Sequence, residues 1–448
     1  MLARPMIRRE VVRREVVRCQ VVRWCALVLL LATGAACSTA ESSVATRAES
    51  VDGSAPTTTA AAPNAACDSE PTLCRAETEQ SSIEIKGKVS EPVSVAPVAG
   101  SPLATIDRDA GLSVRLTDDS VLWLFGDTAA RDETGAVKYF VIGTASWAPA
   151  LEPTVTRDFA DPVSGEPVVL ATPTAEFPQC PDPSQRKGMW PASAVVEQVG
   201  SLDRVIIWLM NVCLIGDDKS APVLSGMGMS VAEWWYDPNS PPIDSPIQVT
   251  MLNQQLFTDL SYGIASLRGP DDTVFAYRCE DQSETVPAKK GSGPCSVART
   301  TLSDVADPDS YKPWNGESYD SSAPPGDLEL PTRVYAPIPP GSFSVSQDPV
   351  SSSYLMAYTP WPAWIDIMEI RVASSPAGPW SKPVSIRLPG CDDSFGSRRF
   401  GCYAAIAQPS FGNAGELGIG WYDSMVTSFP IRGSLKVATV PLKITGPS

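Results

Sequence analysis

Two aspartates, Asp109 and Asp127, are the residues of this sequence best suited to acid–base chemistry. Asp109 opens the segment 109–116, and Asp127 directly follows the apolar run 121–125. The 448 residues include no histidine, which excludes Ser-His-Asp hydrolysis, Cys-His proteolysis and histidine-ligated zinc. Two carboxyl groups that flank a glycosidic bond suffice to hydrolyse it without a cofactor. The pair is therefore a candidate catalytic acid and base, or acid and nucleophile.

Each aspartate also has a structural interpretation. Gly-Asp-Thr around Asp127 is ordinary turn chemistry. Asp109 follows Arg108, so it could be a structural acid neutralised by that arginine, or Arg108 could favour ionised carboxylates around it. Glu280, which adjoins Cys279, could likewise have only a local role.

Aromatic and polar residues are expected at the same end of the fold as the two aspartates. Aromatic rings stack on the faces of sugars, while carboxylates and amides bind hydroxyl groups, so this composition indicates a carbohydrate site. The candidate ligand-binding residues are Arg108, Trp190, Asn211, Tyr262, Arg278, Glu280, Trp361, Trp364, Tyr403 and Asp423.

The elements that must position these residues are predicted from five imperfect copies of one repeat. Each copy begins with a strand rich in small residues, at 109–116, 190–196, 262–267, 343–346 and 403–407. A bulkier strand follows each, at 121–125, 205–210, 274–277, 354–358 and 417–422. Third strands are predicted at 139–146, 226–234, 295–300, 367–373 and 435–440.

This pattern predicts an all-β, five-bladed β-propeller over residues 83–448. Inner strands crowd the central axis and need small residues, while middle strands pack between blades and are large and apolar. The 43 prolines disfavour long helices. The last copy has three strands before the chain ends, so residues 83–105 are expected to add its outer strand and close the ring. A β-sandwich with a second domain is the alternative fold.

The N-terminus has the pattern of a secretory signal peptide, predicted over residues 1–36. Seven arginines precede a short apolar run at 24–32, and small residues then lead to Cys37. Cys37 is expected to carry a lipid anchor on the outer face of the cell membrane, although Gly34 stands where leucine is usual; simple cleavage and secretion is the alternative. Met6 is an alternative start. Residues 37–82, rich in Ala, Thr, Ser and Pro, are expected to be a disordered tether.

Eight cysteines follow Cys37, and an even number in an exported chain indicates disulfides. We predict pairing between neighbours in the sequence. The predicted bonds are Cys67–Cys74, Cys180–Cys213, Cys279–Cys295 and Cys391–Cys402. Metal ligation by these cysteines is disfavoured because no Cys-x-x-Cys pair occurs.

The charge of the chain restricts its partners. Removing residues 1–36 takes away seven arginines and two glutamates, which changes the formal charge from −16 to −21. Such a chain repels phosphate backbones, so nucleic acid is not an expected partner. We expect a monomer that contacts the membrane only through its lipid anchor. Oxygen ligands for Ca²⁺ are plentiful, but no twelve-residue calcium loop is present, so neither a metal nor another cofactor is predicted.

Two segments resemble known families. Residues 108–113 followed by 122–128 resemble the opening of an actinobacterial secreted family, long catalogued as a domain of unknown function, that includes endo-D-arabinanases acting on the arabinan of the mycobacterial cell wall. Residues 373–381 resemble a motif of five-bladed arabinanase and fructosidase propellers. The resemblance covers roughly residues 100–445. It implies cleavage by two aspartates, with Asp109 and Asp127 at the matching positions.

One departure from the broader arabinanase pattern is that the second and third inner strands carry no acid. They begin with Trp190 and Tyr262, so a three-acid site is absent at matching positions. The sequence therefore predicts a cell-envelope glycoside hydrolase that acts on arabinan or another furanose-rich polysaccharide through two carboxylates. The alternative is a non-catalytic lipoprotein that binds glycan or protein with the same propeller face.

Overall fold

The computed structural model describes most of residues 81–446. The described ranges are 81–215, 223–259, 262–279, 294–322, 324–328, 343–360, 366–391, 401–424 and 432–446. The predicted signal peptide, residues 37–80 of the predicted tether, Cys37 and the Cys67–Cys74 bond lie outside them and stay predictions. The last two residues predicted as tether are ordered, because Ser81 is buried and Ser82 begins strand β1 (Ser82–Ile85). Glu280, Trp361 and Trp364 also lie outside the described residues.

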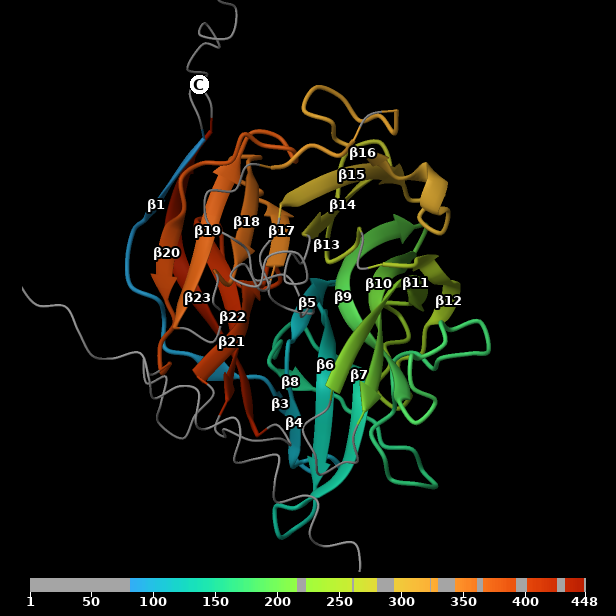
Figure 1. Ribbon diagram of the computed structural model, residues 1–448. Coiled ribbons are helices and arrows are strands. Elements are labelled where there is room, and N and C mark those ends of the chain that lie inside the picture. The colour runs from blue at the N-terminus through green and yellow to red at the C-terminus, as the bar shows by residue number, and fades with distance from the viewer. Residues whose placement is uncertain are drawn as a thin grey trace, which may run out of the picture. The chain divides into compact units, whose positions relative to one another are not determined.

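Five antiparallel sheets stand around a common centre and form the blades of a propeller (Figure 1). This confirms the predicted all-β fold, and the repeats correspond to blades one to five in chain order. From the inner edge outward, blade one contains β5 Leu112–Arg115, β6 Val121–Arg131 and β7 Val137–Ala148, and blade two contains β9 Arg186–Val199, β10 Leu202–Ile215, β11 Val223–Tyr236 and β12 Thr250–Phe257. Blade three contains β13 Ala265–Arg268, β14 Thr273–Cys279, β15 Cys295–Thr301 and β16 Lys312–Pro313, and blade four contains β17 Phe343–Gln347, β18 Tyr354–Tyr358, β19 Ile367–Ala373 and β20 Val384–Arg387. Blade five contains β21 Gly401–Ala407, β22 Glu416–Ser424 and β23 Gly433–Thr445.

The small residues of the inner strands line a central cavity of about 330 Å³. Its wall is built from β5, β9, β13 and β17 together with the end of β21 and the residues after it. Bulky side chains would fill this space, which explains why the first strand of each repeat is rich in alanine and serine. The cavity therefore agrees with the arrangement inferred from the repeats.

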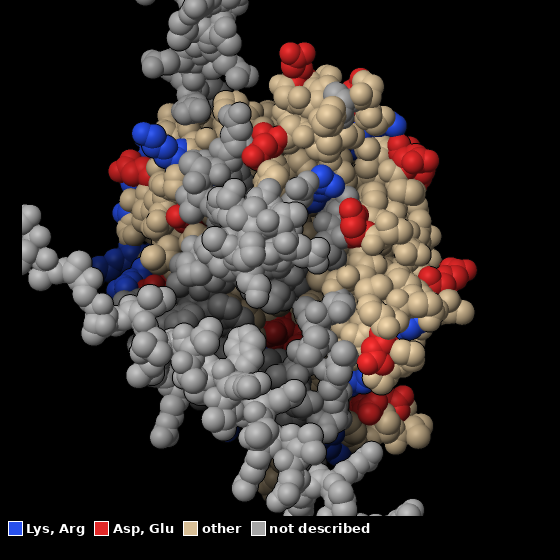
Figure 2. All heavy atoms as spheres, in the orientation of Figure 1, with Lys and Arg blue, Asp and Glu red and all other residues tan. Residues whose placement is uncertain are grey.

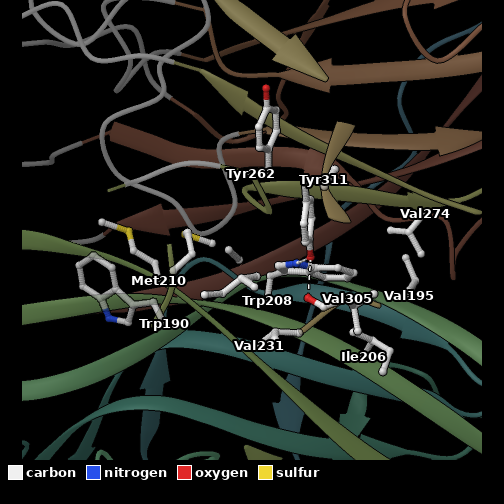
Figure 3. Close-up of a cluster of buried hydrophobic side chains, with 14 of the residues drawn as sticks. Trp190, Val195, Ile206, Trp208, Met210, Val231, Tyr262, Val274, Val305 and Tyr311 are labelled. Atoms are coloured by element: carbon white, nitrogen blue, oxygen red, sulfur yellow. Dashed lines mark hydrogen bonds between the residues drawn. The ribbon is translucent and has the colours of Figure 1, made fainter. Parts of the chain in front are cut away.

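The middle strands form the core between blades, as their apolar composition predicts. Trp123, Trp208 and Trp421, one each from β6, β10 and β22, are fully buried. Figure 3 shows the cluster between blades two and three, where the Trp208 indole donates a 3.0 Å hydrogen bond to the Tyr311 hydroxyl. That hydroxyl donates in turn to the Val305 carbonyl at 2.8 Å, so the indole N–H of Trp208 and the hydroxyl of Tyr311 are both satisfied.

The N-terminal end of the described chain closes the ring. Strand β1 (Ser82–Ile85) pairs antiparallel with β23, which supplies blade five with its outer strand and confirms the predicted closure. Strand β2 (Val93–Ser94) also pairs with β23, and β3 (Ala96–Pro97) pairs in parallel with β8 (Val155–Thr156) beside blade one. One segment thus joins the last blade to the first.

Three of the predicted disulfides are present, at Cys180–Cys213, Cys279–Cys295 and Cys391–Cys402. Disulfides persist in oxidising compartments, which supports export of this domain. Within the described ranges the sole helical element is a 3₁₀ turn at Pro308–Ser310. None of the described helical segments has the length and apolar character needed to cross a membrane.

Candidate active site

The two aspartates lie next to each other in blade one. Asp109 follows β4 (Ile106–Arg108), which pairs with the far end of β6, and Asp127 lies within β6. The backbone N–H of Asp127 donates to Oδ1 of Asp109 at 2.7 Å, and the N–H of Asp109 donates to the carbonyl of Asp127 at 3.1 Å. Asp127 is 8% exposed and Asp109 is half-buried. The two carboxyl groups therefore share one largely dehydrated environment.

Neighbouring blades supply a hydrogen-bond donor to each carboxyl group. Trp190 of β9 donates its indole N–H to Oδ1 of Asp127 at 2.8 Å. Tyr403 of β21 donates its hydroxyl to Oδ2 of Asp109 at 2.9 Å. The site is thus assembled from three blades, with the acids on the first and the donors on the second and fifth.

Burial changes the ionisation of both acids. It raises the pKa of Asp109 to about 6, against hydrogen bonds from Tyr403 and the Asp127 backbone that lower it. Burial and the adjacent Asp109 charge raise the pKa of Asp127 well above its ordinary value, while the Trp190 hydrogen bond and the charge of Arg186 lower it. Acids with raised pKa values in a shared site can hold a proton near neutral pH, as general acid catalysis requires.

The backbone beside this site adopts an uncommon conformation. Ala110 and Ala404, directly after Asp109 and Tyr403, have φ angles of 52° and 55°. Alanine in this left-handed region carries a strain of about 1–3 kcal/mol. The pairing of β21 with β22 also shifts register between Tyr403 and Ile406. Irregularities of this kind change the direction in which side chains point from a strand.

The surface in this view is hollowed near its middle. Figure 2, in the orientation of Figure 1, shows acidic atoms recessed there. Among the described residues, no group of three or more His, Cys, Asp or Glu side chains is placed to hold a metal ion.

Comparison with solved structures yields several chains of similar fold. A candidate hydrolase from Bacteroides ovatus aligns with a TM-score of 0.53 at 14% identity, over 74% of this chain and 85% of its own. An exo-β-1,3-galactanase from Phanerochaete chrysosporium aligns with a TM-score of 0.40 at 12% identity, over 80% of this chain and 64% of that one. An exo-1,5-α-L-arabinanase from a bovine ruminal metagenome aligns at 0.34 and 10%, over 75% and 93%.

These similarities concern the fold alone, because all the identities are low. The sequence matches no protein-family model, and no curated protein matches it. The roles of individual residues in this propeller therefore rest on its own geometry.

Arg108 lies beside the pair but does not neutralise it. Its guanidinium is buried, forms an ion pair with Asp158 and lies 4.0 Å from the centre of the Phe125 ring. It also donates to Ser146 and Thr156. Arg108 therefore anchors the interior of blade one, and the interpretation of Asp109 as the partner of Arg108 does not hold.

Two predicted ligand-binding residues are buried in ways that redefine their roles. Trp190 is 5% exposed, so it contacts Asp127 through its N–H instead of offering an open ring face. Asn211 is fully buried, donates to the carbonyl of Gln254 and accepts from Ser230, so it supports β10 and does not face a ligand.

The remaining described candidates lie apart from the carboxyl pair or at its edge. Tyr262 is 7% exposed and stacks on Tyr311, with the Arg278 guanidinium 5.4 Å from its ring centre. Arg278 also donates to Ser296 at 3.1 Å. Asp423 is half-buried at the end of β22.

Sequence reasoning missed Arg186 as a residue of this site. It lies at the start of β9, donates to the Phe140 carbonyl at 3.3 Å and lowers the pKa of Asp127 through its charge. A signal was available in its position shortly before Trp190 on an inner strand. Its position near Asp127 of the preceding blade depends on how the two blades pack, which the sequence does not give.

Proposed function

We propose that this protein is a glycoside hydrolase of the cell envelope that uses Asp109 and Asp127 to cleave arabinan or a related furanose-rich polysaccharide. The observation that carries the proposal is the shared, dehydrated environment of the two carboxyl groups, in which the backbone N–H of Asp127 donates a 2.7 Å hydrogen bond to Oδ1 of Asp109. Glycosidases need one carboxyl that donates a proton and a second that acts as base or nucleophile.

The hydrogen bonds favour one assignment of these roles. Both oxygens of Asp109 accept hydrogen bonds, which favours its ionised form. Asp127 accepts one, from Trp190, and among the described residues its Oδ2 has no hydrogen-bond partner. Asp127 would therefore hold the proton and transfer it to the leaving oxygen of the glycosidic bond. The carboxylate of Asp109 would then attack the anomeric carbon or activate a water molecule.

The substrate class rests on the sequence and the charge of the chain. Residues 108–113 and 122–128, which resemble the arabinanase-containing family, form the part of blade one that carries both acids. The three disulfides support a location where wall polymers are accessible. A neutral polysaccharide also avoids the repulsion that an anionic polymer would meet at a chain of this charge.

The test is an assay of the purified protein on arabinogalactan and on defined arabinan oligosaccharides, with released reducing ends as the readout. Asp127→Asn and Asp109→Asn should each abolish release. Asp132→Asn is the matched control, because Asp132 lies on the turn after β6 and accepts hydrogen bonds only within that turn. No release from any wall polymer by the wild-type protein would overturn the proposal.

A second candidate is a non-catalytic protein that binds glycan or another protein on the same face. It is favoured by the saturation of Asp109, because a carboxylate whose two oxygens both accept protein donors also suits a purely structural role. Calorimetric titration with the same oligosaccharides separates the two candidates. Binding by the wild-type protein without turnover, unchanged in Asp127→Asn, would favour the binding role.

A further inference from the structure

We infer that Tyr403, contributed by blade five, is a positioning residue that holds Asp109 of blade one as an oriented carboxylate. This inference rests on the proposed function and deepens it, because it assigns to a residue expected to bind sugar the task of preparing one acid of the pair. It also makes the junction between the last and the first blade part of the site.

The contact is direct and lies at the site itself. The Tyr403 hydroxyl is 2.9 Å from Oδ2 of Asp109, while Oδ1 accepts the Asp127 N–H at 2.7 Å. Donors at both oxygens fix the plane of the carboxyl group and leave it little freedom to rotate. Trp190 binds the other acid, so each carboxyl has its own side-chain donor from a different blade.

The Tyr403 hydroxyl is restricted to the role of donor. Burial and the charge of Asp109 raise the pKa of Tyr403 well above its ordinary value, so its proton is retained at any working pH. A protonated hydroxyl facing a carboxylate oxygen stabilises the ionised form of that acid. The hydrogen bond therefore opposes the effect of burial on Asp109.

The backbone on both sides of Tyr403 is constrained. Cys402 precedes it and is bonded to Cys391, and Ala404 follows it in the left-handed conformation. Among the described residues, six other than glycine have a positive φ, and Ala110 and Ala404 are the two alanines among them. The other four are aspartates and a serine, the residue types common in turns. The strain at the two alanines thus coincides with the residues that orient Asp109 and Tyr403 toward each other.

Tyr422 provides a matched control for a substitution at Tyr403. Its ring packs edge-on against that of Tyr403, with 5.0 Å between centres; Tyr422 is fully buried, whereas Tyr403 is half-buried. Its hydroxyl makes no hydrogen bond with the described residues. Tyr422→Phe therefore removes a hydroxyl from the same aromatic pair, near the charge of Asp109, without removing a hydrogen bond to Asp109.

The experiment compares Tyr403→Phe with Tyr422→Phe on the full chain, after equal melting temperatures have shown that both fold. The pH dependence of kcat/KM is measured on arabinogalactan. Losing the hydroxyl should move the acidic limb of Tyr403→Phe upward by about one pH unit, because a hydrogen bond to a charged group stabilises that charge by at least this amount. Tyr422→Phe should keep the wild-type limb. Superimposable limbs for Tyr403→Phe and wild type would overturn the inference.

A second readout separates this inference from the proposed function. The protein is labelled with ¹³C at aspartate carboxyl carbons, and the Asp109 resonance is identified by its loss in Asp109→Asn. Its titration midpoint should rise in Tyr403→Phe and stay unchanged in Tyr422→Phe, whether or not a polymer is cleaved. An inactive wild-type protein with the expected titration shift would overturn the proposed function but support the positioning role of Tyr403. An active protein without the shift would support the proposed function but overturn the positioning role.

Discussion

Blades one and five carry different side chains at similar backbone positions. Tyr403 precedes Ala404 as Asp109 precedes Ala110, both alanines having a positive φ, and Asp423 lies on the middle strand β22 as Asp127 lies on the middle strand β6. Blade one thus presents two acids, whereas blade five presents a hydrogen-bond donor and one acid. The propeller repeat supplies equivalent positions, and single residue changes at those positions turn one blade into a carboxyl pair and its neighbour into the support of that pair.

The contact between blades one and five also shows why the propeller ring must close accurately for the site to form. Tyr403 and Asp109 come from the two ends of the propeller sequence, yet their side chains are 2.9 Å apart. Strands β1 and β2 hold β23 of blade five, and the same segment continues to β3 beside blade one. Closing the propeller ring therefore also brings the residues of the site together.

The largest expected effect distinguishes the equivalent acids of the two blades. Asp127→Asn should lower kcat by about 10³-fold or more, because a positioned acid contributes 10²–10⁴-fold and the variant cannot donate the proton. Asp423→Asn should leave kcat within about threefold and act at most on KM, since the proposed acid and base both lie on blade one. Steady-state kinetics on arabinogalactan measure both. An equal loss of kcat in the two variants would contradict the comparison.

Trp190→Phe should have the next largest effect. It keeps a buried ring but removes the N–H that Asp127 accepts, so kcat should fall by about tenfold, as expected for one hydrogen bond to a charged group. The same bond lowers the pKa of Asp127, so the basic limb of the kcat profile should move to higher pH. The control is Trp123→Phe, whose indole binds the Pro153 carbonyl away from the site. A basic limb that stays in place would show that Trp190 only fills space.

The raised pKa of Asp109 predicts a stability effect of smaller size. Between the unfolded value near 3.8 and the folded value of about 6, the folded protein binds the extra proton, so this acid makes unfolding easier as the pH rises through that window. Asp109→Asn should therefore melt a few degrees higher than wild type at pH 8, and the difference should shrink toward pH 4.

Calorimetry across this pH range checks the expectation, and Asp132→Asn on the turn after β6 serves as the control. The pKa of Asp132 is lowered by its hydrogen bond to Thr134, so its loss should not stabilise the protein at pH 8. A lower melting temperature for Asp109→Asn at pH 8 would contradict the assigned cause.

The smallest effect is expected at the two strained alanines. Ala110→Gly and Ala404→Gly relieve an unfavourable φ but add backbone freedom to the unfolded chain, and the two contributions of about 1 kcal/mol largely cancel. Melting temperatures should stay within about 2 °C of wild type, and activity within about threefold. Ala407→Gly, in the regular part of β21, should destabilise more. A large loss of activity at Ala404→Gly would show that alanine itself is needed there.

Much of the fold was predictable from local residue types. The apolar run at 121–125 lies within β6, and the small-residue strand at 403–407 lies within β21, because inner and middle positions of a blade make different demands on side-chain volume. Three disulfides formed between sequence neighbours, as short hairpins allow. The aspartates were identifiable because each adjoins a predicted strand end at the same face.

The roles of the surrounding residues were not predictable in the same way. Trp190 and Tyr262 were expected to present open ring faces, yet both are buried, since neighbouring blades cover them. Asn211 follows an apolar run and was expected at a rim, but β12 and β11 satisfy its amide inside the blade. Sequence position gives the end of a strand but not which neighbour covers it.

The sequence by itself determined the repeat, the order of strands and the presence of two acids in the first repeat, because these depend on local volume, polarity and alternation. Only the tertiary structure decided that Tyr403 and Trp190 bind those acids and that both carboxyl groups lose water. Burial and donor contacts depend on blades that are distant in the chain and adjacent in space. The ionisation of Asp109 and Asp127 is therefore a property of the closed ring.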